Sequence, residues 1–176
     1  MKQLNNFIQE KLTIKSDTKI NKYNYYPEDK DELLMIIKKL IKERGEKADL
    51  NDIDTSEITD MSHLFDKISF NGDISEWNVS NVKNMSWMFT KSKFNGDISK
   101  WDVSKVEMMC GMFMESEFNQ DISDWNVSNV ENMHLIFSKS KFNQDLNNWN
   151  PKKVLAMKFA FYKSPLEKNP PKWYRK

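Results

Sequence analysis

Apolar residues recur at an interval of 24 positions over most of the chain. The interval relates four tryptophans, five methionines and five phenylalanines: Trp77, Trp101, Trp125 and Trp149; Met61, Met85, Met109, Met133 and Met157; Phe65, Phe89, Phe113, Phe137 and Phe161. A weaker first copy starts near Ala48. Because one such unit cannot bury its apolar side chains alone, the pattern predicts five copies stacked on one another.

Within one copy, two shorter periods suggest secondary structure. Val82, Met85 and Phe89 follow helical spacing, which predicts a short helix over residues 81–90. Ser80 precedes it as a capping residue, and Trp77 and Val79 alternate with Asn78 as a short strand does. The predicted fold class is therefore an α/β repeat solenoid of the leucine-rich-repeat type, with a short strand and a short helix per 24-residue turn over residues 48–164.

The flanking segments predict a helical cap over residues 1–47 and a proline-rich tail over residues 165–176. Residues 27–44 begin with Pro27, carry acidic residues in the first turn and end at Gly45, which predicts the main helix. Residues 1–12 are amphipathic and belong either to the cap or to a docking segment, and residues 19–26 suggest an edge strand. The tail, with Trp173, either covers the last repeat or binds a partner.

Polar residues at the same interval suggest ladders along the stack. Lys91, Glu115 and Lys139 alternate in charge, as neighbours on stacked turns should. The asparagine that follows each repeat phenylalanine predicts an inward hydrogen-bonded ladder, and the aspartate two residues later predicts bonds to the following backbone. The asparagines are Asn71, Asn95, Asn119 and Asn143, and the aspartates are Asp73, Asp97, Asp121 and Asp145.

The repeat resembles that of the BspA-like leucine-rich-repeat surface proteins. The stretch FNQDISDWNVSNVENM, from Phe118 to Met133, nearly reproduces their FNQDISxWDVSNVxxMxxMF motif, and the resemblance covers residues 48 to about 162. It implies adhesion and partner binding without catalytic residues. The first residues lack the apolar stretch of a secretion signal, so we expect a cytoplasmic protein, or one associated with a virion or a host cytoplasm if phage-encoded.

Charge and composition argue against several other functions. With 27 basic and 26 acidic residues the net charge is +1, which favours neither nucleic acid nor a membrane surface. His63 and His134 are too far apart in a stack to share a metal, and Cys110 has no partner at a fixed spacing. The chain also lacks a glycine-rich phosphate loop. We therefore expect no enzyme activity, cofactor or metal.

Comparison of the copies separates the framework from the variable positions. Variation concentrates on the predicted helices, and it predicts a partner-binding surface at His63, Trp87, Thr90, Met114, His134 and Leu135. Trp87 lies off the apolar stripe, so it is either exposed as a binding anchor or packed against a neighbouring helix. The predicted function is a non-catalytic protein-protein interaction module. The alternative is a phage or mobile-element protein that docks in a larger assembly or inhibits a host enzyme by direct binding.

Overall fold

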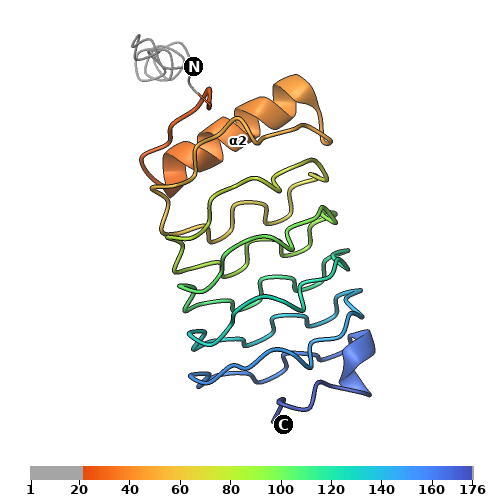
Figure 1. Cartoon of the computed structure of the whole chain (residues 1–176). Coiled ribbons are helices and arrows are strands. Elements are labelled where there is room, and N and C mark those ends of the chain that lie inside the picture. Colours follow the sequence, from red (N-terminus) through yellow and green to blue (C-terminus); the bar gives the residue numbers. More distant parts are fainter. Residues whose placement is uncertain (1–21, 176) are drawn as a thin grey trace.

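The computed structural model describes residues 22–175 as a stack of irregular turns with one helix laid across its first end (Figure 1). The helix is α2, Lys30–Arg44, and a single 3-10 turn, η1, spans Pro165–Glu167 near the other end. Five stacked turns are joined by isolated parallel bridges that recur every 24 residues, at Asp60, Asn84, Met108, Asn132 and Ala156. The 24-residue register is thus confirmed. Predictions for residues 1–12, and for the start of 19–26, lie outside the described residues.

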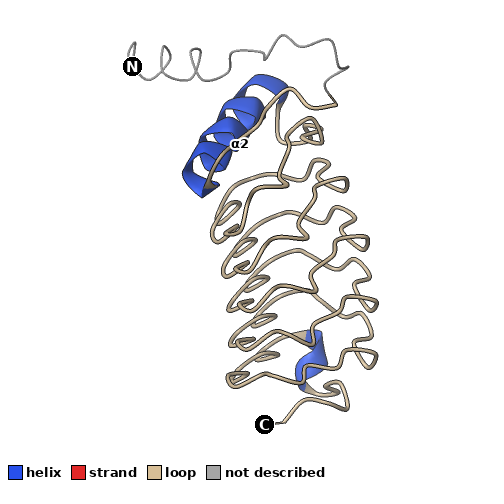
Figure 2. Ribbon diagram, turned by 60° about the vertical axis from the view of Figure 1, so that its left-hand side comes forward, coloured by secondary structure: helices blue, strands red, loops and turns tan. Residues whose placement is uncertain are grey.

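The secondary structure within each turn differs from the prediction. Within residues 22–175, α2 is the one α-helix and the parallel bridges stay isolated, so the turns are drawn as loops throughout (Figure 2). The prediction of an α/β solenoid of the leucine-rich-repeat type, with a strand at 77–79 and a helix at 81–90, is therefore wrong. Ser80 caps no helix; its amide instead donates to Oδ1 of Asn78 at 3.1 Å.

The backbone shows why a helically spaced segment does not form a helix. Trp87 and Lys91 have φ of 61° and 54°, in the left-handed region that ends a right-handed helix. The amides of Met85, Trp87, Phe89 and Lys91 donate to carbonyls of the next turn, at 2.8 to 2.9 Å. Amides between them, such as that of Met88, bond three residues back instead. Hydrogen bonds between turns therefore replace the bonds within a helix.

Aromatic side chains form stacked rows through the core. Phe65, Phe89, Phe113, Phe137 and Phe161 stack with ring centroids 5.4 to 5.9 Å apart. The tryptophans stack in the same way, Trp77 on Trp101 and Trp125 on Trp149, each pair at 6.4 Å. Each tryptophan Nε1 also donates to a carbonyl of the preceding turn, beginning with Trp77 to Leu50 at 3.0 Å. The predicted shared apolar interior is confirmed.

The tail continues this pattern instead of leaving the stack. Trp173 follows Trp149 by a further 24 residues, stacks on it at 6.0 Å and donates from Nε1 to the carbonyl of Leu146 at 2.7 Å. Tyr174 packs edge-on against Phe161 at 5.0 Å. Of the two roles considered for the tail, the structure shows the one in which Trp173 covers the last repeat.

Helix α2 closes the other end of the stack and confirms the predicted helix, except that it begins at Lys30 and leaves Pro27 outside its first turn. Its side chains Leu33, Ile36, Ile37 and Leu40 are buried in the same core as the repeats. Asp29 caps its first turn by accepting from the amide of Glu32 at 2.9 Å, and Gly45 follows its last residue with φ of 88°. The helix therefore shields the apolar face of the first turn from water.

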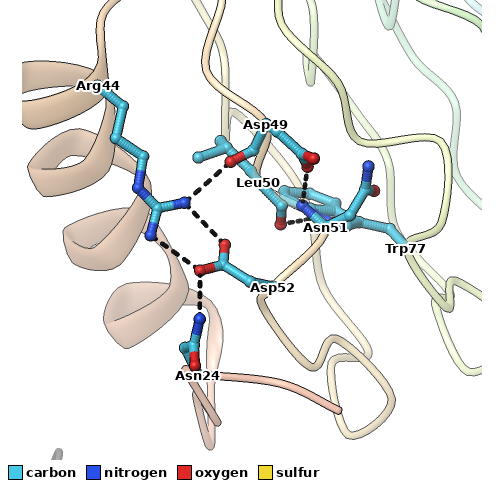
Figure 3. A network of polar contacts seen from close by, with 7 residues as sticks. All are labelled: Asn24, Arg44, Asp49, Leu50, Asn51, Asp52 and Trp77. Atoms are coloured by element: carbon cyan, nitrogen blue, oxygen red, sulfur yellow. Dashed lines mark hydrogen bonds and ion pairs between the residues drawn. The ribbon is translucent and has the colours of Figure 1, made fainter.

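A polar network fastens the end of α2 to the first turn (Figure 3). Arg44 donates from both terminal nitrogens to the carboxylate of Asp52, at 2.9 and 2.8 Å, and also to the carbonyl of Asp49. Asn24 donates to the same carboxylate at 2.9 Å. The guanidinium of Arg44 is the main cause that holds the pKa of Asp52 below its usual value. This bidentate pairing joins the last turn of α2 to the first turn of the stack.

The predicted polar ladders are present, with one correction. Oδ1 of Asn71 accepts from the amide of Asn95 at 2.9 Å, and the same bond joins Asn95 to Asn119 and Asn119 to Asn143. Asn71, however, is exposed, so the ladder runs along the surface and its predicted inward orientation is wrong. Between turns, Glu115 pairs with Lys91 at 3.7 Å and with Lys139 at 3.4 Å, which confirms the alternating charges.

The repeat aspartates bind the following backbone, as predicted. Oδ1 of Asp73, Asp97 and Asp121 each accepts from the amide two residues later, at 2.9 Å in all three turns. This main-chain donor is the leading cause that lowers the pKa of each of the three carboxyls below its usual value. The bonds hold the tight turn that follows each of these aspartates.

The lowered pKa values of these aspartates predict that acid destabilises the fold. A carboxyl whose pKa is lower when folded contributes stability that is complete above its unfolded pKa of about 3.9 and is lost as the pH falls through the folded value. We therefore expect the urea concentration at the unfolding midpoint to decrease as the pH drops below about 4. In the triple variant Asp73→Asn, Asp97→Asn, Asp121→Asn, the midpoint should fall less steeply with acid.

Two other turns of the chain show why asparagine is a suitable replacement for these aspartates. Asn78 and Asn126 make the same turn with an amide oxygen, at 3.1 and 3.2 Å, so asparagine keeps the acceptor while it removes the titration. Urea unfolding of both proteins at neutral and acid pH makes the comparison. Identical acid dependence in the two proteins would show that other carboxyls dominate.

Candidate protein-binding surface

Two positions of every turn lie in the left-handed region, and the first of them forms a row along the stack. Its φ values lie between 59° and 62°, and its residues are His63, Trp87, Gly111, Leu135 and Phe159. We call this row the αL column. A left-handed conformation costs a non-glycine residue roughly 1 kcal/mol, and four of the five residues bear that cost. The conformation is retained because each turn must present its amides to the next.

Trp87 lies flat between its two neighbours in the αL column. Its ring stacks on that of His63 with centroids 6.4 Å apart and planes 18° from parallel. On the other side it covers Gly111, where an added Cβ would lie 2.2 Å from the indole ring. The absence of a side chain at Gly111 therefore makes room for Trp87, which is left half-buried. Neither alternative considered for Trp87 describes this arrangement completely, since no neighbouring helix is present there.

The remaining predicted residues divide between the surface and the interior. Met114, His134 and Leu135 are half-buried on the surface. Thr90 does not belong to it, because its side chain is 4% exposed and its hydroxyl donates to the carbonyl of Gly111 at 2.8 Å. That prediction is wrong: the position after the repeat phenylalanine points inward at Thr90, where a helix would have turned it outward.

The comparison of repeat copies within the sequence missed the surface residues of the last turn. Phe159 is 45% exposed, continues the αL column and lies against His134 at 6.2 Å. Leu155 and Tyr162 beside it are exposed as well, at 87% and 38%. The signal was available, because Phe159 follows Leu135 by 24 residues. The surface therefore extends to the C-terminal end of the stack.

The groups considered for chemistry occupy separate places. His63 lies 3.4 Å from the carboxylate of Asp66 at the start of the αL column, and His134 lies three turns further along. Burial raises the pKa of the Cys110 thiol, which lowers the thiolate fraction available for reaction. Among residues 22–175, no three histidine, cysteine or acidic side chains come together as metal ligands do. In the same residues no helix has the length and apolar character needed to cross a bilayer.

Comparison with protein families relates this architecture to known sequences. The family described as "Mycoplasma protein of unknown function, DUF285" matches residues 36–117 and 114–174. The chain belongs to this family. The DUF285 match begins within α2 and ends at Tyr174, so it includes the end of the helix, all five turns and the tail. No curated protein and no solved structure matches the chain.

Proposed function

We propose that the chain is a non-catalytic protein-binding module that contacts another protein through the αL column together with Met114 and His134. The observation that carries the proposal is the placement of Trp87, half-exposed and supported on both faces by His63 and Gly111. A rigid, partly exposed aromatic ring loses little conformational freedom on binding, and such residues are frequent binding anchors.

Variation within the chain supports the same proposal. Framework positions keep one residue type through the turns, as the phenylalanines from Phe65 to Phe161 do. The αL column instead carries histidine, tryptophan, glycine, leucine and phenylalanine on an otherwise constant backbone. A constant scaffold with variable surface residues is the usual arrangement in repeat proteins that bind other proteins.

The resemblance to the BspA-like repeat proteins adds a second line of support. The motif FNQDISDWNVSNVENM links the chain to proteins assigned to adhesion and partner binding. A net charge of +1 agrees with a protein partner more readily than with nucleic acid. We extend the proposal to a cytoplasmic location and to function without cofactor or metal.

The substitution Trp87→Gly tests the proposal. Glycine occupies the equivalent position at Gly111, so the variant keeps a residue that tolerates φ near 60° and loses only the ring. Affinity purification from the native cell should identify a partner that co-elutes with the wild-type chain. With that partner purified, we expect Trp87→Gly to raise the dissociation constant at least about tenfold, as loss of a binding anchor does.

Thermal unfolding of the same two proteins is the control. Glycine relieves the left-handed strain while the lost ring removes a stack on His63, so the midpoint should change by only a few degrees, about 4 °C or less. A matched surface variant, Lys83→Gly, should leave binding unchanged because Lys83 is exposed outside the αL column. Unchanged affinity of Trp87→Gly would refute this surface.

A further inference from the structure

The stack ends in an incomplete sixth turn. Residues 166–173 repeat the register of residues 142–149: Leu166 takes the place of Phe142, and Trp173 that of Trp149. Lys172 donates its amide to Oδ1 of Asn147 at 3.0 Å, which adds this segment to the edge of the turn before it. The tail thus covers the first half of the fifth turn. The second half, residues 154–163, has no further turn stacked on it within the part of the chain that the structure describes; Trp173 and Tyr174 contact it at Phe161, at 6.0 and 5.0 Å.

The uncovered half-turn carries backbone donors without acceptors. In the inner turns these amides bond to the next turn, as Met85, Trp87 and Phe89 bond to residues 108, 110 and 112. The equivalent amides of the last turn belong to Met157, Phe159 and Phe161. No residue among 22–175 accepts a hydrogen bond from any of these three amides. They form a row of donors in the register that a further turn would use.

Apolar side chains surround this row of donors. Three of the four large hydrophobic side chains that are exposed in residues 22–175 lie here: Leu155, Phe159 and Tyr162. With Met157 and Tyr174 they line an open hollow of about 760 Å³. An exposed apolar hollow beside unpaired backbone amides is a recognised setting for the addition of an extended segment.

Two copies of this chain cannot cover the half-turn. If two such edges faced each other, the amides of Met157, Phe159 and Phe161 in one copy would face the same amides in the other. A head-to-tail arrangement would need the first turn of the second copy, but α2 packs over that turn and buries Leu64 completely. A segment of another protein can supply carbonyl oxygens in the register of a repeat turn.

The third turn of this chain shows which side chains such a segment should carry. Trp87 lies over Gly111, so a large ring in the αL column fits against a glycine on the next turn. Lys91 pairs with Glu115, so a lysine at that position is followed by an acidic residue. The last turn has Phe159 and Lys163 at these two positions. Its complement is a glycine and, four residues later, a glutamate or aspartate.

Charge favours the same occupant. Residues 150–175 contain Lys152, Lys153, Lys158, Lys163, Lys168, Lys172 and Arg175 against the single acidic residue Glu167. The ammonium groups of Lys158 and Lys163 lie over the rings of Phe159 and Tyr162, at 5.0 and 5.3 Å. A basic rim around an apolar hollow attracts an acidic segment and disfavours a basic one.

We propose that the uncovered half-turn at residues 154–163 binds an acidic segment of a partner protein that has the pattern of the second half of the repeat, Val-x-x-Met-x-Gly-Met-Phe-x-Glu. The segment completes the sixth turn by accepting hydrogen bonds from Met157, Phe159 and Phe161. This site shares Phe159 with the αL column but does not include Trp87, so its test can fail without failure of the Trp87 test.

A peptide from the chain itself serves as the probe. Residues 104–117, SKVEMMCGMFMESE, contain the glycine and the glutamate in the required spacing and carry a net charge of −2; Cys110 is replaced by serine to prevent oxidation. Titrated into the full chain, the peptide should bind saturably. Hydrogen exchange followed by NMR should then show added protection at the amides of Met157, Phe159 and Phe161, and none at Met85.

A charge exchange makes the test specific. Lys163→Glu should weaken peptide binding roughly fivefold, and a peptide with lysine in place of Glu115 should bind that variant better than it binds the wild-type chain. A scrambled peptide of the same composition is the control. The proposal is refuted by equal binding of the scrambled peptide, by unchanged exchange at the three amides, or by no recovery in the charge-exchanged pair.

Discussion

Replacing Phe113 by alanine is expected to remove roughly 3–5 kcal/mol from the free energy of unfolding. Phe113 is completely buried in the middle turn, and its ring stacks on Phe89 at 5.6 Å, on Phe118 at 4.3 Å and on Phe137 at 5.5 Å. The substitution interrupts the row from Phe65 to Phe161, removes the contact with Phe118 and leaves a cavity between neighbouring turns. Because domains of this size are stable by only about 5–15 kcal/mol, much of the stability should be lost.

Urea unfolding followed by circular dichroism measures this loss, and Phe159→Ala is the matched control. Phe159 is the same residue type at an exposed position, 45% accessible, so its replacement should change the free energy of unfolding by less than about 0.5 kcal/mol. Comparable losses in the two variants would contradict the continuous core described here.

Replacing Ile37 by aspartate is expected to detach α2 from the stack. Ile37 is completely buried against the first turn, and the variant both removes its apolar contacts and buries an unpaired charge, a combined loss of more than about 4 kcal/mol. Repeat turns contact mainly their neighbours, so the damage should begin at the first turn and decrease along the stack.

Hydrogen exchange resolves this gradient. In a milder variant, Ile37→Ala, the amides of Met61 and Phe65 should lose protection well before those of Met133 and Phe137. Lys38→Asp, at an exposed position in the same helix, should leave the first turn protected. Equal loss of protection at Met61 and Met133 in Ile37→Ala would show that α2 does not act as a local cap.

The αL column shows how a surface can follow from a backbone requirement. Trp87 is held at φ of 61° because its amide must reach the carbonyl of Cys110 in the next turn, at 2.8 Å. The resulting orientation lays its ring over Gly111 and against His63. The geometry of the stack therefore sets the direction of the side chains that we propose for binding.

Much of the repeat organisation was evident in the sequence. The 24-residue interval determined which residues are equivalent, and equivalence alone predicts that Phe65, Phe89 and Phe113 share one row, that Glu115 pairs between two lysines, and that Asn95 bonds Asn71. The helix predicted over residues 27–44 is present over 30–44, because its acidic first turn, its apolar face and the glycine that ends it are local features of the sequence.

Tertiary structure alone decided the conformation within each turn. Val82, Met85 and Phe89 are spaced as in a helix, but stacking turns offer each amide a carbonyl of the next turn, and these bonds between turns outweigh those within a helix. The direction of Thr90 and the exposure of Asn71 and Phe159 follow from that choice. Periodicity specifies which residues become neighbours, whereas the backbone conformation depends on hydrogen bonds between residues of adjacent turns, which no local pattern encodes.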